Sequence, residues 1–154
     1  MRLELVKDWM SRDVMTVTPT MSLHEADALM RLHGIRRLPV VVDGRLVGII
    51  TSGDLREADT ARLRDLGVTT RNDSLSQLIV AQIMTPDPLT ILPDKTIGEA
   101  AQQMLQYAIG ALPVVAAGGE LAGIITESDI FRMVVHDWMS AQGSSTEPYT
   151  RYDV

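Results

Sequence analysis

Residues 38–54 read LPVVVDGRLVGIITSGD, and residues 112–129 read LPVVAAGGELAGIITESD. The likeness extends outward from this stretch, so that Val6 to Arg56 returns as Val80 to Phe131, shifted by 74 residues up to Gly44 and by 75 after it. A unit of about fifty residues buries too little apolar surface to be stable on its own. The duplication therefore predicts two similar units that stack and share one core.

Each copy carries the same order of strand and helix signals. A short β-prone stretch, residues 16–18 or 90–92, precedes a capping box, Ser22-x-x-Glu25 or Thr96-x-x-Glu99, which begins a helix. The quoted stretch follows as two strands joined by a tight hairpin, with a proline that must lie first in its strand or on an edge. A last helix begins after the threonine. The chain is therefore predicted to have an α/β (α+β) fold of two β-α-β-β-α repeats with pseudo-twofold symmetry.

The repeats set the expected domain boundaries. We expect the first repeat over residues 1–59, a connector over 60–79, the second repeat over 80–139 and a flexible tail over 140–154. The connector is polar and turn-rich, with a short helix predicted from Ser74 through Ile83. The tail is rich in Ser, Thr, Gln and Gly, a composition that does not form a packed core by itself.

Composition excludes several classes of protein. The chain has no cysteine, which removes disulfides and thiolate metal sites, and its three histidines do not stand at ligand spacing. The net charge is −6, so a nucleic-acid partner is not expected. No apolar run is long enough for a membrane span, and the first ten residues do not form a signal peptide. We therefore expect a cytoplasmic protein without a metal site.

The motif Gly-Ile-Ile-Thr-x-x-Asp is the main candidate for chemistry, and it ends at Asp54 and Asp129. It predicts a strand that ends at the threonine, followed by a helix whose first turn holds the carboxylate beside unpaired backbone N–H groups. A carboxylate there can accept hydrogen bonds from two sugar hydroxyls, and the helix start favours a nearby anion. Thr-x-x-Asp is also a capping box, in which both side chains serve only the helix. Spacing alone favours the capping-box interpretation over the ligand-binding one.

The combined pattern resembles a tandem pair of cystathionine-β-synthase (CBS) domains, the Bateman module. The resemblance covers nearly everything from Val6 to about Val135 and rests on the motif, the preceding Leu-Pro-Val-Val and the duplication. Narrower stretches, VKDWM at 6–10, IRRLPV at 35–40, DLREA at 54–58 and ESDIFR at 127–132, are similar to bacterial CBS proteins of the acetoin-utilisation type.

The resemblance implies a non-catalytic regulatory module that binds AMP, ADP, ATP or S-adenosylmethionine in clefts between the repeats and requires no cofactor. The motif aspartates would take the ribose hydroxyls, the motif threonines would line the same pocket, and the first strand and the segment before the proline would hold the adenine. The implied ligand-binding residues are Thr16, Val17, Ile35, Arg36, Arg37, Leu38, Thr51 and Asp54 in the first copy, and Thr90, Ile91, Ile109, Gly110, Ala111, Leu112, Thr126 and Asp129 in the second. The resemblance also implies a homodimer built through helices and a regulated enzyme or transporter.

The two copies differ where the resemblance places phosphate contacts. The first copy has Arg36-Arg37 and the second has Gly110-Ala111. Two guanidiniums can clamp a phosphate by charge-assisted hydrogen bonds, whereas Gly-Ala offers only backbone. We therefore expect unequal clefts, of which one prefers a charged nucleotide. The alternative for the arginines is a solvated basic pair after a helix, and the alternative for the whole chain is a structural or dimerisation module whose clefts are closed.

Overall fold

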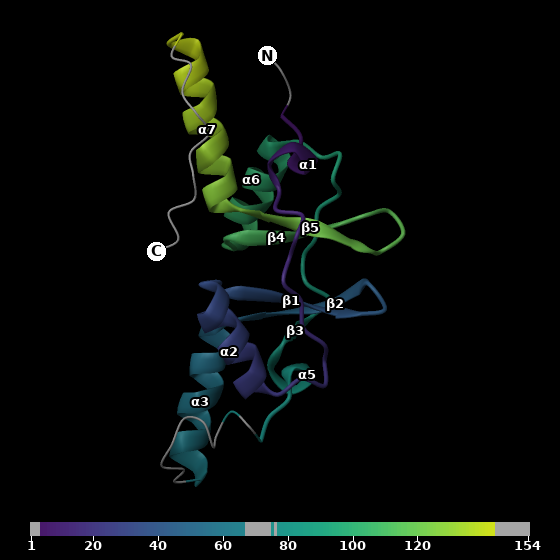
Figure 1. Cartoon of the computed structure of the whole chain (residues 1–154), viewed down its shortest axis with the longest axis vertical. Coiled ribbons are helices and arrows are strands. Elements are labelled where there is room, and N and C mark those ends of the chain that lie inside the picture. Colours follow the sequence, from purple (N-terminus) through teal and green to yellow (C-terminus); the bar gives the residue numbers. More distant parts are fainter. Residues whose placement is uncertain (1–3, 67–74, 76, 144–154) are drawn as a thin grey trace. The chain divides into compact units, whose positions relative to one another are not determined.

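The chain forms two compact units in a computed structural model that describes residues 4–66, 75 and 77–143 (Figure 1). One unit is Val14–Pro88, and we call it the Asp54 unit. The other joins Met1–Asp13 to Leu89–Val154, and we call it the Asp129 unit. Each unit has its own cluster of buried apolar side chains, and the sharing of one core between the units remains a prediction.

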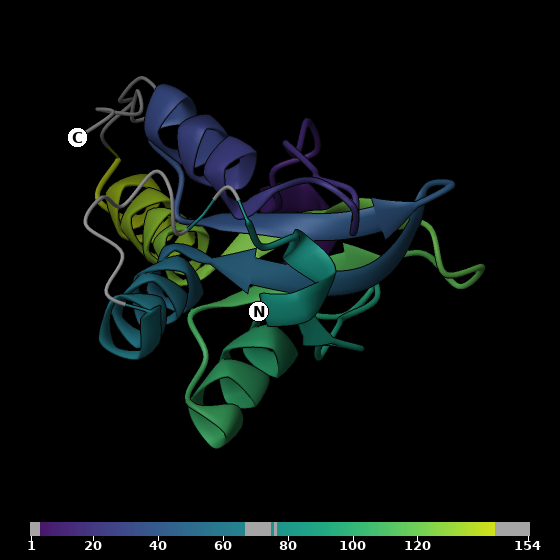
Figure 2. The same ribbon diagram turned by 90° about the horizontal axis from the view of Figure 1, so that it is seen from below.

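The Asp54 unit follows the predicted order of elements. Helix α2 (Leu23–His33) begins at the predicted capping box, in which the Ser22 N–H donates to Glu25 Oε2 over 2.9 Å and the Glu25 N–H donates to Ser22 Oγ over 3.1 Å. Strands β1 (Arg37–Val42) and β2 (Arg45–Thr51) pair antiparallel (Figure 2), and helix α3 (Ser52–Leu66) continues from β2. The intervening turn has positive φ at Asp43 and Gly44, 52° and 77°, as a two-residue hairpin requires.

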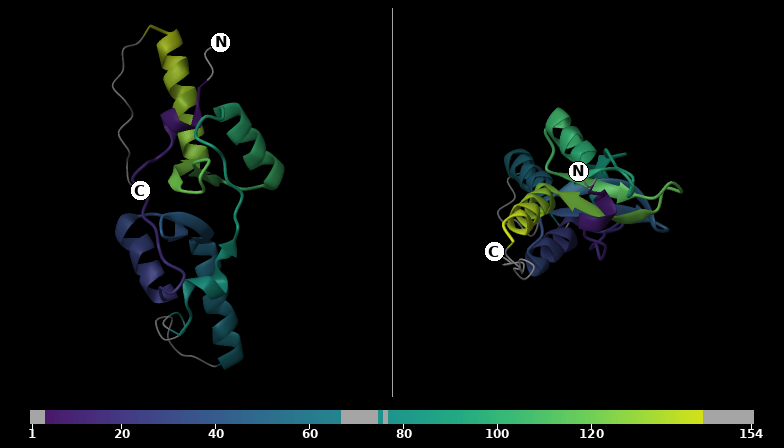
Figure 3. Two further views of the ribbon diagram at one scale, coloured as in Figure 1. Left: turned by 90° about the vertical axis from the view of Figure 1, so that its right-hand side faces the viewer. Right: turned by 90° about the horizontal axis from the view of Figure 1, so that it is seen from above.

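The Asp129 unit repeats this plan. Helix α6 (Ile97–Tyr107) begins at the second capping box, strands β4 (Ala111–Val115) and β5 (Leu121–Thr126) pair antiparallel, and helix α7 (Glu127–Ala141) continues directly from β5 (Figure 3). Val41 pairs with Leu46 in the first hairpin and Val115 with Leu121 in the second. The extra residue that changes the repeat shift from 74 to 75 therefore lies in the second hairpin turn.

Each unit is completed by a segment that precedes the other repeat in the sequence. Helix α5 (Val80–Ile83) and strand β3 (Thr85–Pro86) pack in the Asp54 unit, where β3 pairs with β2. Helix α1 (Val6–Trp9) packs on β5 and α7 in the Asp129 unit, and Ser11 exchanges two backbone hydrogen bonds with Ile124. The compact units therefore do not coincide with the sequence repeats, because each unit takes in a segment from before the other repeat. The repeat boundaries expected from the sequence stay a prediction.

A glycine allows each of these segments to approach closely. A Cβ added at Gly48 would lie 2.6 Å from Met84 Sδ, and one added at Gly123 would collide with the Ser11 carbonyl oxygen and lie 2.9 Å from Met10 Sδ. The Thr85 carbonyl oxygen lies 3.0 Å from the position of a Cβ on Gly48, so at both glycines a backbone oxygen crowds the place of a side chain. The glycine of the repeated motif is therefore explained by packing inside each unit.

Pro39 and Pro113 lie third, not first, in β1 and β4, and both strands are edge strands of their named sheets. The Pro39 carbonyl accepts a hydrogen bond from the Val17 N–H, so this side of the residue faces away from β2. The missing N–H of proline therefore costs the hairpin no hydrogen bond.

Two further expectations concern the connector and the tail. The helix predicted from Ser74 through Ile83 is wrong at residues 77–79, which are not helical, and α5 begins only at Val80. Ile79 is extended and its N–H donates to Gln82 Oε1 over 2.9 Å, which caps the short helix. Residues 60–66 continue α3. Residues 67–74 and the tail from 144 lie outside the described residues. None of the helices that the structure describes has both the length and the apolar content needed to cross a membrane.

Candidate functional site

In the Asp54 unit, the motif places Asp54 in the first turn of α3, next to the end of β2. The Thr51 N–H donates to Asp54 Oδ2 over 2.8 Å, and the Asp54 N–H donates to Thr51 Oγ1 over 3.2 Å. The capping-box interpretation is therefore correct for these contacts. Asp54 remains partly exposed, and its Oδ1 accepts no hydrogen bond within the part of the chain that the structure describes. This carboxylate oxygen is available to a ligand.

In the Asp129 unit, the equivalent carboxylate is fully engaged. Asp129 Oδ2 accepts hydrogen bonds from the Thr126 N–H over 2.8 Å and from Thr126 Oγ1 over 3.0 Å. Asp129 Oδ1 accepts one from Arg132 Nη1 in an ion pair. The Asp129 side chain is only 2% exposed. The two motifs thus fold alike, but both oxygens of Asp129 accept hydrogen bonds from described residues, whereas only Oδ2 of Asp54 does.

The predicted phosphate-binding arginines lie beside the Asp54 turn. Arg37 is the cross-strand partner of Thr51, and the Ser52 N–H donates to the Arg36 carbonyl over 2.9 Å. Neither guanidinium forms an ion pair or a hydrogen bond with the described residues. In the other unit, Ala111 is the cross-strand partner of Thr126, and the Gly110 carbonyl accepts a hydrogen bond from the Glu127 N–H. The backbone beside the Asp54 turn therefore carries two arginines, whereas the equivalent places beside the Asp129 turn carry no charge.

The remaining predicted residues lie elsewhere along the strands. Val17 bridges to Val40, and Ile91 bridges to Val114, on the side of β1 and β4 that faces away from the hairpin partner. Thr16 and Thr90 precede them. Leu38 and Leu112 are fully buried in the two cores, with Ile35 and Ile109 packed against those cores. The structure therefore groups the arginines with the Thr-x-x-Asp turn, whereas the first strand lies across β1 or β4 from it.

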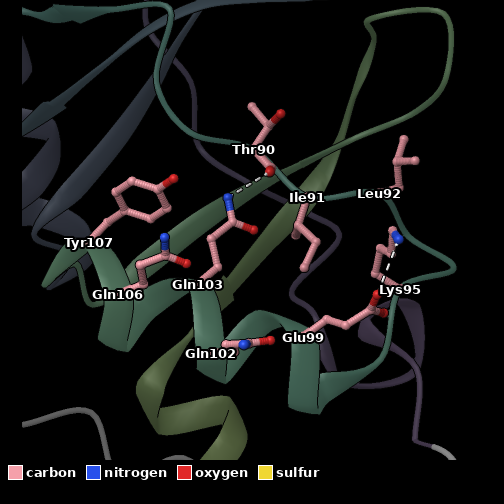
Figure 4. Close-up of a pocket in the computed structure, with 9 residues that line it drawn as sticks. All are labelled: Thr90, Ile91, Leu92, Lys95, Glu99, Gln102, Gln103, Gln106 and Tyr107. Atoms are coloured by element: carbon pink, nitrogen blue, oxygen red, sulfur yellow. Dashed lines mark hydrogen bonds and ion pairs between the residues drawn. The ribbon is translucent and has the colours of Figure 1, made fainter.

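A groove of about 520 Å³ runs between residues 90–92 and helix α6 (Figure 4). Its lining residues are Thr90, Ile91, Leu92, Lys95, Glu99, Gln102, Gln103, Gln106 and Tyr107. Only Thr90 and Ile91 belong to the predicted set, and Gln103 Nε2 donates to the Thr90 carbonyl over 3.3 Å. The three glutamines were not predicted. Aligning the two copies would have drawn attention to them, because the first copy has Ala28, Leu29 and Leu32 at the equivalent positions.

One carboxyl group at the end of this groove has a shifted pKa. The Thr96 backbone N–H, first, and the Lys95 ammonium, second, lower the pKa of Glu99 from its ordinary value of 4.5. Both contacts are visible as hydrogen bonds, of 2.9 Å and 3.1 Å. Glu99 thus serves as the capping carboxylate of α6.

Sequence reasoning also missed Arg132. Its signal was the spacing of three residues after Asp129, which places both side chains on one face of a helix. Glu57 holds the equivalent position after Asp54. Among the described residues, no group of three or more His, Cys, Asp or Glu side chains is placed to hold a metal ion.

Comparisons with known proteins identify the family of the two repeats. The family model of the CBS domain matches residues 6–61 and again residues 80–136. Inosine-5'-monophosphate dehydrogenase of Korarchaeum cryptofilum is 42% identical over 125 residues, a match that covers 81% of this chain and 23% of the dehydrogenase. The chain thus spans about a quarter of that relative.

Three solved structures match over nearly their whole length. The Vibrio cholerae protein AcuB, assigned to acetoin utilization, aligns with a TM-score of 0.77 at 28% identity, covering 94% of this chain and all of that one. CBSX2 in complex with AMP aligns with a TM-score of 0.76 at 27% identity, covering 88% and 99%. The CBS domain pair of protein MJ0100, in complex with 5'-methylthioadenosine and S-adenosyl-L-methionine, aligns with a TM-score of 0.71 at 31% identity, covering 88% and 99%.

Proposed function

The chain belongs to the CBS-domain family and carries two CBS repeats, and from this premise we propose that it is a non-catalytic regulatory module that binds an adenosine-containing ligand. The single observation that carries the proposal is that Asp54 Oδ1, and the guanidiniums of the neighbouring Arg36 and Arg37, have no hydrogen-bond or ion-pair partner among the residues that the structure describes. A carboxylate oxygen is a strong acceptor for ribose hydroxyls, and guanidiniums are the preferred partners of phosphate. The combination suits a nucleotide better than either a sugar or an anion alone.

The charge around Asp54 favours an anionic nucleotide. Arg36 and Arg37 would meet the phosphates, and the Asp54 carboxylate would take the ribose hydroxyls. AMP, ADP and ATP present both groups, whereas S-adenosylmethionine lacks a phosphate. The support from relatives is that CBSX2 holds AMP and that MJ0100 holds S-adenosyl-L-methionine and 5'-methylthioadenosine. We therefore place the phosphate-bearing nucleotides first.

Calorimetry with the full chain tests this proposal. AMP, ADP, ATP and S-adenosylmethionine are titrated separately, and the proposal expects saturable heat with at least one nucleotide and the weakest binding with S-adenosylmethionine. A mass-spectrometric search for small molecules that copurify with the protein supplies an independent readout. The absence of heat with all four compounds, together with no copurifying nucleotide, would reject the proposal.

Regulation requires that the ligand binds one arrangement of the protein better than another. We propose that the signal passes to a regulated enzyme or transporter in the cytoplasm, through a homodimer. A turnover assay with each nucleotide and divalent metal tests the non-catalytic part of the proposal, because sustained product formation would contradict it.

A second candidate function is a structural or dimerisation module. One face of α7 leaves Phe131, Val134, Val135 and Trp138 between 41% and 66% exposed, a spacing that forms an apolar stripe on a helix. The capping contacts of both aspartates fit this function as well. Sedimentation of the wild type and of Trp138→Ser measures self-association. Dimerisation that depends on Trp138, combined with silence in calorimetry, would favour this second function.

A further inference from the structure

We infer that residues 57 and 132, at equivalent positions of the two repeats, decide which repeat takes the ligand, and that the chain holds one tight nucleotide, at Asp54. Arg132 occupies the Asp129 carboxylate and so withholds it from a ribose. Glu57 leaves the Asp54 carboxylate open. The inference rests on the proposed function and adds to it the number of sites and the residue pair that sets this number.

The Asp129 carboxylate has little left to offer a ligand. Its two oxygens already accept three hydrogen bonds, two from Thr126 and one from Arg132. The side chain is 2% exposed, whereas the Arg132 side chain that covers it is 34% exposed. A ribose hydroxyl must therefore displace the Arg132 guanidinium before it reaches Asp129 Oδ1. Displacing the arginine would also leave Asp129 buried without its counterion, which is unfavourable.

The Asp54 carboxylate lacks such a competitor. Glu57 is an exposed residue without a hydrogen to donate at neutral pH, and its negative charge cannot pair with Asp54. Arg36 and Arg37 lie beside the Asp54 turn along the backbone, and neither guanidinium pairs with a residue that the structure describes. They are free to meet a phosphate while Asp54 Oδ1 meets the sugar. In this unit the arginines and Asp54 can therefore bind different groups of a ligand, whereas in the other unit Arg132 and Asp129 form an ion pair with each other.

The size of the difference follows from the bond that must be broken. A hydrogen bond to a charged group corresponds to a factor of about 10 to 150 in an equilibrium constant. We therefore expect the Asp129 site to bind AMP at least about tenfold more weakly than the Asp54 site. Calorimetry at a concentration near the tighter dissociation constant would then count one nucleotide per chain.

The test is a calorimetric count of AMP on the full chain in matched variants. The wild type should bind one AMP tightly, Asp54→Ala should abolish this site, and Asp129→Ala should leave it. Arg132→Gln frees the Asp129 carboxylate of the positive charge while keeping a hydrogen-bond donor, and it should raise the second site into the measurable range. Glu57→Arg places the same cation after Asp54 and should weaken the first site about tenfold or more.

The controls separate this inference from the proposed function. Arg45→Gln removes an arginine at the far end of β2 from Thr51, so the count should stay at one. Thermal unfolding of each variant establishes that it is folded. If Arg132→Gln does not fold, the inference is tested by Glu57→Arg instead. Two equally tight sites in the wild type, or an unchanged first site in Glu57→Arg, would overturn the inference alone. Absence of heat in the wild type and in every variant would overturn the proposed function and the inference with it.

Discussion

Replacing Asp54 by alanine separates the two roles that the structure gives this carboxylate. Its Oδ2 caps α3 by accepting the Thr51 N–H over 2.8 Å, and its Oδ1 accepts no hydrogen bond from any residue in the described ranges. Loss of the cap should lower the free energy of unfolding by about 0.5–2 kcal/mol. Loss of one charged hydrogen bond to a ribose hydroxyl should weaken AMP binding by about 1.5–3 kcal/mol, which is a factor of about 10 to 150.

The matched control is Glu25→Ala. Glu25 closes the capping box of α2 in the same unit, with hydrogen bonds of 2.9 Å and 3.1 Å to and from Ser22, and no ligand role is proposed for it. Its loss should cost similar stability and leave the AMP affinity unchanged.

The assays are urea unfolding for stability and calorimetry for AMP affinity, on the wild type and both variants. The two variants should match in unfolding and differ about tenfold or more in affinity. If Asp54→Ala and Glu25→Ala lose stability alike and bind AMP as the wild type does, Asp54 is only a helix cap, and the reasoning about its free oxygen is refuted.

Three other predictions concern packing, pH and charge. Gly123→Ala should lower the free energy of unfolding by about 1–3 kcal/mol, because its Cβ meets a backbone carbonyl, whereas Gly118→Ala, which has no atom within 4 Å, should be near neutral; urea unfolding measures both. Glu99→Gln should destabilise the protein at pH 7, and the loss should disappear as the pH falls from 4.5 through the lowered pKa of folded Glu99, because the carboxylate is then protonated in both states; equal losses at pH 7 and pH 3 would contradict this. Arg36→Gln with Arg37→Gln should weaken ATP binding more than S-adenosylmethionine binding in calorimetry, and equal effects would count against phosphate contacts.

Local sequence signals predicted most of the secondary structure. The capping boxes at Ser22 and Thr96, the hairpin after Val42 and the helix after Thr126 all lie where the sequence placed them. These features depend on a few neighbouring residues, whose hydrogen-bonding and turn preferences act over short distances. The CBS assignment followed from the order of such signals and their duplication.

Packing between distant segments was harder to predict. The repeat pattern assigns Val6 to the first copy, yet α1 packs in the Asp129 unit, because Gly123 accepts the close approach of Ser11. The helix expected from Ser74 through Ile83 does not run through residues 77–79, because Ile79 pairs as an extended residue with Ser22. Both outcomes depend on partners many residues away, which periodicity does not encode.

The candidate site was predicted in part for the same reason. The predicted hairpin pairs its two strands antiparallel, and this pairing brings Arg37 opposite Thr51. The ion pair of Arg132 with Asp129 depends on side-chain rotamers and burial, so the copies looked equivalent at the motif itself. The assignment of ligand-binding roles remains a prediction.

The central claim is that the Asp54 carboxylate holds the sugar of an adenosine nucleotide. The most direct test is calorimetry with AMP and with 2'-deoxy-AMP on the wild type and on Asp54→Ala. The wild type should bind AMP about tenfold or more tightly than the deoxy compound, and this preference should vanish in the variant. Equal binding of AMP and 2'-deoxy-AMP by the wild type, or a preference that survives in Asp54→Ala, would contradict the claim.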